Sequence, residues 1–202
     1  TDGSQVWNKN HVLMPNGSGL GGNSSSTQSA LIVRQPGTNN YYIFTTDGFN
    51  GGNGLQYNVV DVTLNGGLGD VTVKNQVLYT PTTERVTACT LANGVDVWIL
   101  SHESTGANFI AHLLTNAGMS GTVVNSPVGP SFNGAGLDFL GNLKFSAQGN
   151  RVAMAVSNPD YFWLFDFDRT TGILTNPIQL QSTASFEGAY GVEFSPNGNV
   201  LY

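Results

Sequence analysis

One stretch, residues 141–180, constrains this chain most, because it reads as four short strands and the pattern then begins again. Its apolar or β-branched runs are separated by breaks rich in Gly, Asn and Pro, which is typical of strands joined by turns. The sequence YGVEFSPNGNVLY (190–202) repeats the pattern of GNLKFSAQGNRVAM (141–154). The chain is therefore predicted to contain repeats of a four-stranded unit.

Two sets of markers give the repeat a common period. The turn glycines Gly94, Gly149 and Gly198 are 55 and 49 residues apart. Third-strand positions Asp61, His112 and Asp166 are 51 and 54 residues apart, and each is followed six residues later by Gly. A period near 50 residues with four strands per unit favours an all-β fold, a β-propeller of four-stranded antiparallel blades. The alternative is an ordinary β-sandwich with regular turns.

The markers divide the chain into three whole units between two half units. We expect a single propeller domain or a slice of one: a half blade 1–28, blades 29–83, 84–140 and 141–189, and a half blade 190–202. In the second blade the fourth strand is weak and is expected near Thr122–Asn125. Either the chain is an interior slice of a longer propeller or its two halves pair to close a ring; its start without Met favours the slice.

Composition excludes several classes of protein. Charged residues make up only 10% of the chain and the net charge is −6, so no basic cluster exists to bind nucleic acid. No apolar run approaches the length of a membrane span. The single Cys89 lies in a strand pattern and is interpreted as a buried, inert thiol.

The loops that join strand two to three, and one unit to the next, are mostly long and irregular, whereas the other turns are short. Functional groups concentrate on long loops held by a rigid frame. This face collects one base, Arg85, and a set of acids: Asp2, Asp47, Glu84, Glu103, Asp138, Asp160 and Glu187. Such a rim could bind a cation such as Ca²⁺ or a basic partner; the simpler interpretation is a set of solvated loop carboxylates. No other cofactor or metal is expected.

No catalytic motif is complete in the sequence. The segment His102-Glu103-Ser104 is expected on a loop, where neighbours in sequence do not make a triad. Asp166 and Asp168 form a close carboxylate pair, but a turn-capping role fits better because Asp61 occupies the matching place in another unit. For the same reason His112 is interpreted as structural.

Several phrases in series resemble a known group of propellers. They include YYIFTTDG (41–48), FWLFDFDRTTGILTNPIQL (162–180) and YGVEFSPNGNVLY (190–202). These resemble propeller regions of large Bacteroidota surface proteins of the gliding-motility-associated kind, which are exported by the type IX secretion system. The resemblance implies an extracellular or outer-membrane-associated module, and the family has no defined catalytic residues to transfer.

Two functions follow from these observations. The first is a non-catalytic binding or scaffolding module in gliding motility, adhesion or a type IX secretion assembly, with protein or glycan partners, in a longer chain or larger assembly. The alternative is a hydrolase propeller similar to the lactonases, which share the turn motifs. The alternative requires that acid–base groups converge at the ring axis, and the candidates are Glu84, His102, Asp138 and Glu187.

Overall fold

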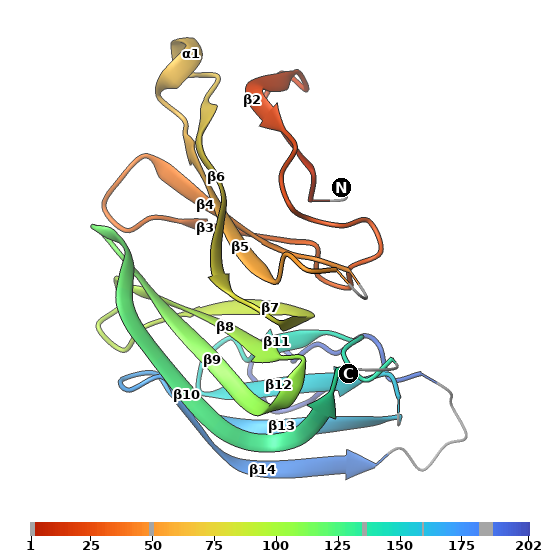
Figure 1. The fold of residues 1–202 in the computed structure, drawn as a ribbon. Coiled ribbons are helices and arrows are strands. Elements are labelled where there is room, and N and C mark those ends of the chain that lie inside the picture. Colours follow the sequence, from red (N-terminus) through yellow and green to blue (C-terminus); the bar gives the residue numbers. More distant parts are fainter. Residues whose placement is uncertain (1–2, 49–50, 135–136, 159, 182–187) are drawn as a thin grey trace.

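Three four-stranded antiparallel sheets, each with its strands in chain order, make up most of the molecule (Figure 1). In the computed structural model the residues described are 3–48, 51–134, 137–158, 160–181 and 188–202. The sheets follow one another along the chain, and each packs its flat face against the next. This is the predicted all-β architecture of propeller blades.

We call the three sheets blades A, B and C. Blade A contains β3 (Ala30–Arg34), β4 (Asn40–Thr46), β5 (Leu55–Asp61) and β6 (Asp70–Tyr79). Blade B contains β7 (Thr82–Thr90), β8 (Val97–Glu103), β9 (Thr105–Thr115) and β10 (Gly118–Asn133). Blade C contains β11 (Leu143–Phe145), β12 (Arg151–Val156), β13 (Tyr161–Asp168) and β14 (Ile173–Gln181).

A partial sheet lies before and after these blades. At the N-terminal side β1 (Gln5–Trp7) pairs with β2 (Leu13–Ser18). At the C-terminal side an antiparallel bridge joins Phe194 to Leu201. The short helical element is α1 (Leu64–Gly67), a single turn between β5 and β6. The described chain thus forms three whole blades between two partial ones.

Apolar side chains fill the seams between successive blades. Between blades B and C, Phe109 meets Phe165 edge to face, with ring centroids 4.8 Å apart. Phe44 of blade A packs in one cluster with Ile99 and Leu114 of blade B. Burying each such side chain contributes about 1.5–3 kcal/mol, so the blades are stabilised chiefly through their neighbours.

Strand β10 corrects the sequence-based prediction. It extends over 16 residues rather than the short segment expected near Thr122–Asn125. Its pairing register with β9 shifts twice, between Met119 and Val123 and between Pro127 and Phe132. The Gly and Pro residues that suggested loops therefore lie in irregularities of an edge strand, where proline and bulges are tolerated.

The two ends of the blades differ, and Figure 1 shows them on opposite sides of the molecule. The turn end carries the connections from the first to the second and from the third to the fourth strand of each blade, including α1 at the upper left of the view. The loop end, on the right of the view, carries the connections from the second to the third strand and from one blade to the next. Near the loop end Gln28 links β7 and β11, the first strands of blades B and C. Its Oε1 accepts the N–H groups of Leu143 at 2.9 Å and Val86 at 3.4 Å.

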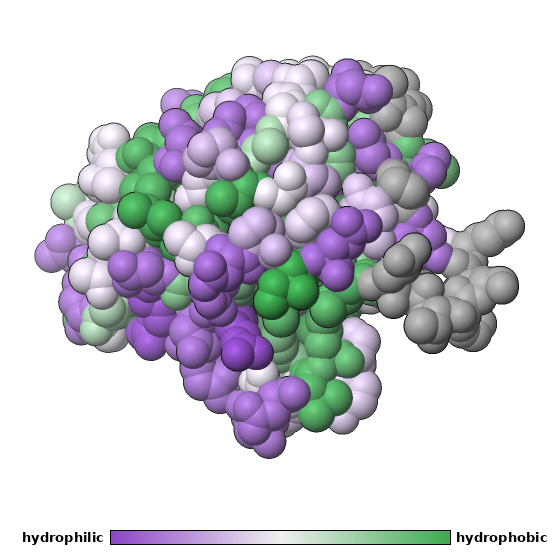
Figure 2. Space-filling view, turned by 90° about the horizontal axis from the view of Figure 1, so that it is seen from below, coloured by the Kyte–Doolittle hydropathy of each residue, from purple (hydrophilic) through white to green (hydrophobic). Residues whose placement is uncertain are grey.

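The outer surface is predominantly polar. Figure 2 shows the molecule from the side of blade C, where apolar residues are interspersed among mostly hydrophilic ones. On β14, Ile178 and Leu180 are 51% and 36% exposed. Within the described residues, no helix has the length and apolar character needed to cross a membrane.

Candidate functional site

A bulge at the start of β7 places two charged residues inside the protein. Thr82 pairs with Glu103 and Val86 pairs with Ser101, so three residues of β7 lie opposite the single His102 of β8. Bulges break the alternation of a strand and redirect side chains. As a result the adjacent Glu84 and Arg85 are both buried, at 1% and 0% exposure.

Glu84 is held by a neighbouring blade and keeps one oxygen unused. Its Oε2 accepts the N–H of Thr27 at 2.6 Å and the Thr27 hydroxyl at 2.9 Å. Its Oε1 has no hydrogen-bond partner among the described residues. A buried carboxylate oxygen without a partner is costly, so this atom is a candidate to bind a ligand.

Arg85 is the cation at the centre of the site. Its Nε and Nη2 donate to the carbonyl of Ala155, and Nη2 also donates to the carbonyls of Asp138 and Leu140. Burial lowers the pKa of Arg85 to about 9, while the charges of Asp138 and Glu84 raise it. Arg85 therefore remains protonated at neutral pH and links blade B to blade C.

The position of His102 and Glu103 differs from the loop that the sequence suggested. They are the last residues of β8 and are 0% and 7% exposed. His102 lies between the rings of Phe109 and Phe132, and burial lowers its pKa to about 3. His102 is thus neutral, and Glu103 accepts both the N–H and the side-chain amide of Asn108 at 2.8 Å.

Asp138 completes the charged group around Arg85. Burial raises the pKa of its carboxyl, and the nearby Arg85 charge lowers it. Its Oδ1 has no partner among the residues that the structure describes. We call Glu84, Arg85, His102 and Asp138 the loop-end cluster. The described part of the chain contains ten buried side-chain polar atoms without a hydrogen-bond partner. Five of these ten are one atom from each member of the loop-end cluster and the Thr82 hydroxyl.

The other predicted acidic residues do not join this cluster. Asp47 accepts the N–H groups of Gly48 and Asn53 within its own loop. Asp160 accepts the N–H of Ala189. Asp2 and Glu187 lie outside the described residues. The interpretation of all these acids as solvated loop carboxylates is wrong for Glu84 and Glu103, because the β7 bulge and the end of β8 bury them.

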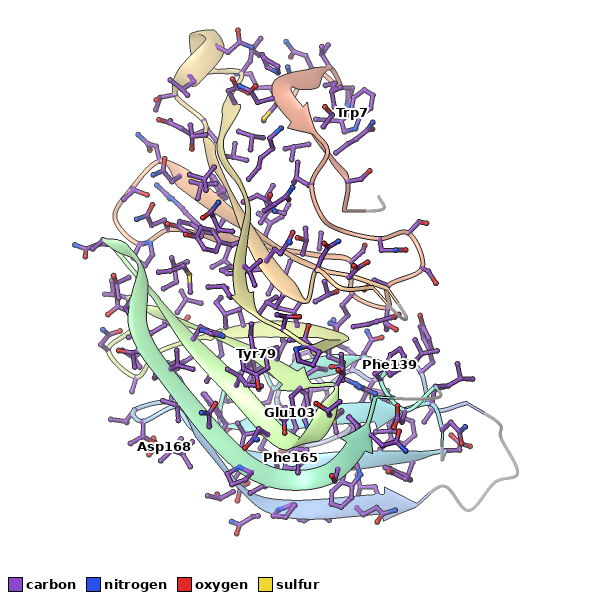
Figure 3. The ribbon with its side chains drawn as sticks, viewed as in Figure 1. Trp7, Tyr79, Glu103, Phe139, Phe165 and Asp168 are labelled. Atoms are coloured by element: carbon purple, nitrogen blue, oxygen red, sulfur yellow. The ribbon has the colours of Figure 1, made fainter. Side chains whose placement is uncertain are left out.

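A cavity of about 240 Å³ opens beside Glu84 between blades A and B. Glu84 and Thr82 both line it, and both bring a buried oxygen that has no partner among the described residues. Ser104, Thr105 and Phe139 also line it. Figure 3 shows Phe139 on the loop side of the molecule, opposite Asp168 at the turn end, with Tyr79 and Glu103 close together between them.

The turn end has a larger cavity but a different chemistry. About 420 Å³ is enclosed near the inner strands by residues that include Cys89, Lys144 and Arg169. Lys144 pairs with Glu193 at 3.1 Å. Arg169 donates to the carbonyls of Thr90, Gln148 and Leu91, and burial raises the pKa of the Cys89 thiol to about 12. The charged groups here are already satisfied. The raised pKa agrees with the predicted inert thiol, but Cys89 is only partly buried rather than fully buried.

The turn-capping interpretation is confirmed for Asp168 and Asp61, whereas Asp166 accepts the side-chain amide of Asn176 at 2.7 Å. Asp168 accepts the N–H of Thr170 and the hydroxyl of Thr171, both at 2.8 Å. Asp61 accepts the N–H of Thr63 at 2.8 Å and its hydroxyl. His112 is buried at 4% exposure within β9, and burial lowers its pKa to about 4. These residues serve the fold rather than a site.

The described part of the chain contains no preformed set of metal ligands. Among residues 3–48, 51–134, 137–158, 160–181 and 188–202, no three His, Cys, Asp or Glu side chains gather as a metal-binding group. Calcium binding at the acidic face, predicted from the sequence, stays a prediction.

Known proteins resemble this chain in structure rather than in sequence. No protein-family model matches the chain, and no curated protein matches it in sequence. A solved structure from Bacteroides fragilis, provisionally assigned as a 6-phosphogluconolactonase, is similar with a TM-score of 0.54 and 13% identity over 96% of this chain and 54% of that one. A protein of the same provisional assignment from Bacteroides uniformis gives 0.52 and 15% over 98% and 55%.

This likeness shows the fold, a β-propeller, and the chain spans about half the length of the solved structures it matches. It also corrects the functional prediction. The preference for a non-catalytic module is contradicted, because these neighbours carry the name of lactone-hydrolysing enzymes. The resemblance to gliding-motility-associated surface proteins is supported only in its coarser part, the propeller.

Sequence reasoning identified Glu84, His102 and Asp138 as scattered candidates, and the structure gathers them around Arg85. It missed Thr82 and the role of Arg85. The available signal was two adjacent charges, Glu84-Arg85, directly before the strand residues Val86–Thr90. A charge pair at that place indicates an interrupted alternation and hence a bulge.

Proposed function

We propose that this protein is a hydrolase that opens lactones, with the reaction at the cavity beside Glu84. The observation that carries the proposal is a pair of residues lining one cavity, Glu84 and Thr82, each with a buried side-chain oxygen, Oε1 and Oγ1, that has no partner among the described residues. Buried polar atoms are nearly always satisfied, and an exception calls for an explanation such as a catalytic role or a bound water or ion. The propeller neighbours support the same class of reaction.

The chemistry follows from the two oxygens. Glu84 Oε1 accepts a proton from a water molecule, whose oxygen forms a bond to the lactone carbonyl carbon. The Thr82 hydroxyl donates to the carbonyl oxygen as negative charge develops there. The ring C–O bond then breaks, and protonated Glu84 returns the proton to the departing alkoxide. The product is a hydroxy acid, and the carboxylate of Glu84 is restored.

Arg85 acts as a positioning residue in this scheme. It does not line the cavity, but its charge interacts with both Asp138 and Glu84. Arg85 therefore offsets the negative charge of Glu84, and Thr27 fixes the orientation of that carboxylate.

The test is lactone hydrolysis followed by acid release, with the spontaneous rate subtracted. We expect wild-type turnover of an aldonolactone and a loss of about 10²–10⁴-fold in kcat for Glu84→Gln, the usual contribution of a general base. The matched control is Glu193→Gln, the same change at the turn end, where the carboxylate is 61% exposed. Equal rates for the two variants, or no wild-type turnover, would reject the proposal.

The location of the protein forms a second part of the proposal. The resemblance to Bacteroidota surface proteins supports export to the cell surface, with protein or glycan partners there. Fractionation of the native organism, followed by protease treatment of intact cells, tests this. Recovery of the full-length chain from the cytoplasm alone would reject it.

A further inference from the structure

The positions of the basic residues define what charge a substrate at the loop end can carry. The chain has seven Lys and Arg residues, and all seven lie among the described residues. Four of them lie at the turn end, beside hairpin connections: Lys9, Arg34, Arg151 and Arg169. Lys74 lies on β6, the outermost strand of blade A, and Lys144 lies on β11 and pairs with Glu193. Only Arg85 lies at the loop end.

Arg85 is not available to an anion in the cavity. It is 0% exposed and is not a lining residue. Its Nε and Nη2 are occupied by the carbonyls of Asp138, Leu140 and Ala155. Its charge lies beside the buried carboxylate of Glu84 and the partly exposed Asp138, so it offsets negative charge that the protein already contains.

The cavity itself carries one ionisable side chain, and that side chain is an acid. Glu84 is the only charged residue among the nine that line it. Thr82, Ser104 and Thr105 supply hydroxyl groups, and Phe139 supplies an aromatic face. Hydroxyls, one carboxylate and one aromatic ring suit a ligand that bears many hydroxyl groups and no charge.

We infer that the substrate is an uncharged, hydroxyl-rich lactone and not a phosphorylated one, an inference that rests on the proposed function. A phosphate monoester carries close to two negative charges at neutral pH. Near the carboxylate of Glu84, with no accessible base to offset it, that charge is repelled. At separations of several ångströms near a protein surface such repulsion lowers binding by about 100-fold or more. This specificity differs from the one named for the two solved neighbours.

The experiment compares D-glucono-1,5-lactone with its 6-phosphate as substrates of the wild-type protein. We expect kcat/KM for the uncharged lactone to exceed that for the phosphorylated one by about 100-fold at low salt. The ratio of the two kcat/KM values should fall at high salt, because salt screens the exposed part of the repulsion between the phosphate and Glu84. A phosphorylated lactone that reacts as fast as the uncharged one, or faster, overturns the inference while the proposed function stands.

A charge-introducing variant sharpens the test. Thr105→Arg adds a base at an exposed lining residue, and we expect it to raise kcat/KM for the phosphorylated lactone relative to the uncharged one, which narrows the ratio about tenfold. Thr122→Arg, at an exposed position of β10, is the matched control and should leave the ratio unchanged. An equal effect of both variants would contradict a local origin of the specificity. If neither lactone is hydrolysed, the proposed function fails, and this inference fails with it.

Discussion

The seam between blades B and C is closed by an arginine at each end, and the two ends differ in what surrounds that arginine. At the turn end Arg169 donates to the carbonyls of Thr90, Leu91 and Gln148. At the loop end Arg85 donates to three other carbonyls in the same way. Of the two, only Arg85 lies beside a buried carboxylate, that of Glu84, and beneath the ring of Phe132, 5.3 Å from its centroid.

This difference shows that the size of a cavity alone does not identify a functional site. The turn-end cavity is larger, about 420 Å³ against about 240 Å³. Its charged groups are paired or bonded to backbone. The smaller loop-end cavity is lined by Thr82 and Glu84, each of which has a buried oxygen without a partner among the described residues. Unsatisfied polar atoms are costly in a folded protein, and here two of them belong to residues that line the same cavity.

The largest expected difference concerns the two arginines. Arg85→Met removes a buried cation and leaves Glu84 and Asp138 uncompensated, which should cost about 3–5 kcal/mol of unfolding free energy. Arg169→Met breaks hydrogen bonds to carbonyls that water can reach and should cost about 1 kcal/mol. Denaturant unfolding of both variants measures this. Equal losses of unfolding free energy would show that the two arginines stabilise the protein equally, and the contrast between the two ends would not hold.

Acid should destabilise the protein through its two buried histidines. Burial lowers the pKa of His102 to about 3 and that of His112 to about 4. The unfolded chain therefore binds protons below about pH 6.5 while the folded chain does not, and stability falls as pH drops from about 6.5 to 4. Each histidine contributes about 1.4 kcal/mol per pH unit in that window.

Two groups of carboxylates bear on this prediction. The pKa of Asp168 is lowered by hydrogen bonds at the turn end, so its contribution is lost only below about pH 4. The raised pKa of Asp138 acts in the opposite sense, since the folded state then binds a proton more readily. Unfolding free energies measured from pH 7 to 4 should fall for the wild type and fall less for His102→Gln. A flat wild-type profile would contradict buried neutral histidines.

A smaller effect is expected at Tyr79, which supports the loop end from β6. Its hydroxyl donates to Glu103 Oε2 at 3.3 Å, and burial together with the Glu103 charge raises the pKa of Tyr79. Tyr79→Phe should cost about 0.5–1.5 kcal/mol, the net value of a hydrogen bond. Tyr202→Phe, at a side chain that is 76% exposed, serves as control and should cost nothing measurable by thermal unfolding.

The smallest effect belongs to the ion pair at the turn end. Lys144 and Glu193 are 34% and 61% exposed, and exposed pairs contribute about 0–1 kcal/mol. Glu193→Gln should therefore change stability little, and the change should vanish in high salt because screening removes it. A loss as large as that of Arg85→Met would show that the turn end carries buried charge as well.

The sequence predicts the blades well because repeated turns are local. Each hairpin glycine, such as Gly149 with φ of 72°, adopts a backbone conformation that Gly favours and that the sequence reveals directly. The length of β10 could not be predicted in the same way. Its Gly and Pro residues look like loop residues until the neighbouring strand β9 holds them in bulges.

The site could be predicted only in part, because its residues meet through contacts distant in sequence. Glu84, His102 and Asp138 come from separate segments, and Thr27 reaches Glu84 from the connection between β2 and β3. The bulge that buries Glu84 and Arg85 together depends on pairing with β8. No periodicity within β7 alone specifies that arrangement.

The most direct test of the account is a crystal structure with a non-hydrolysable lactam analogue of the aldonolactone. The analogue should bind in the cavity between blades A and B, with polar atoms within hydrogen-bond distance of Glu84 Oε1 and Thr82 Oγ1. Glu84→Gln should weaken its binding, and Glu193→Gln should leave it unchanged. An analogue bound in the turn-end cavity beside Arg169, with the loop end empty, would contradict the account.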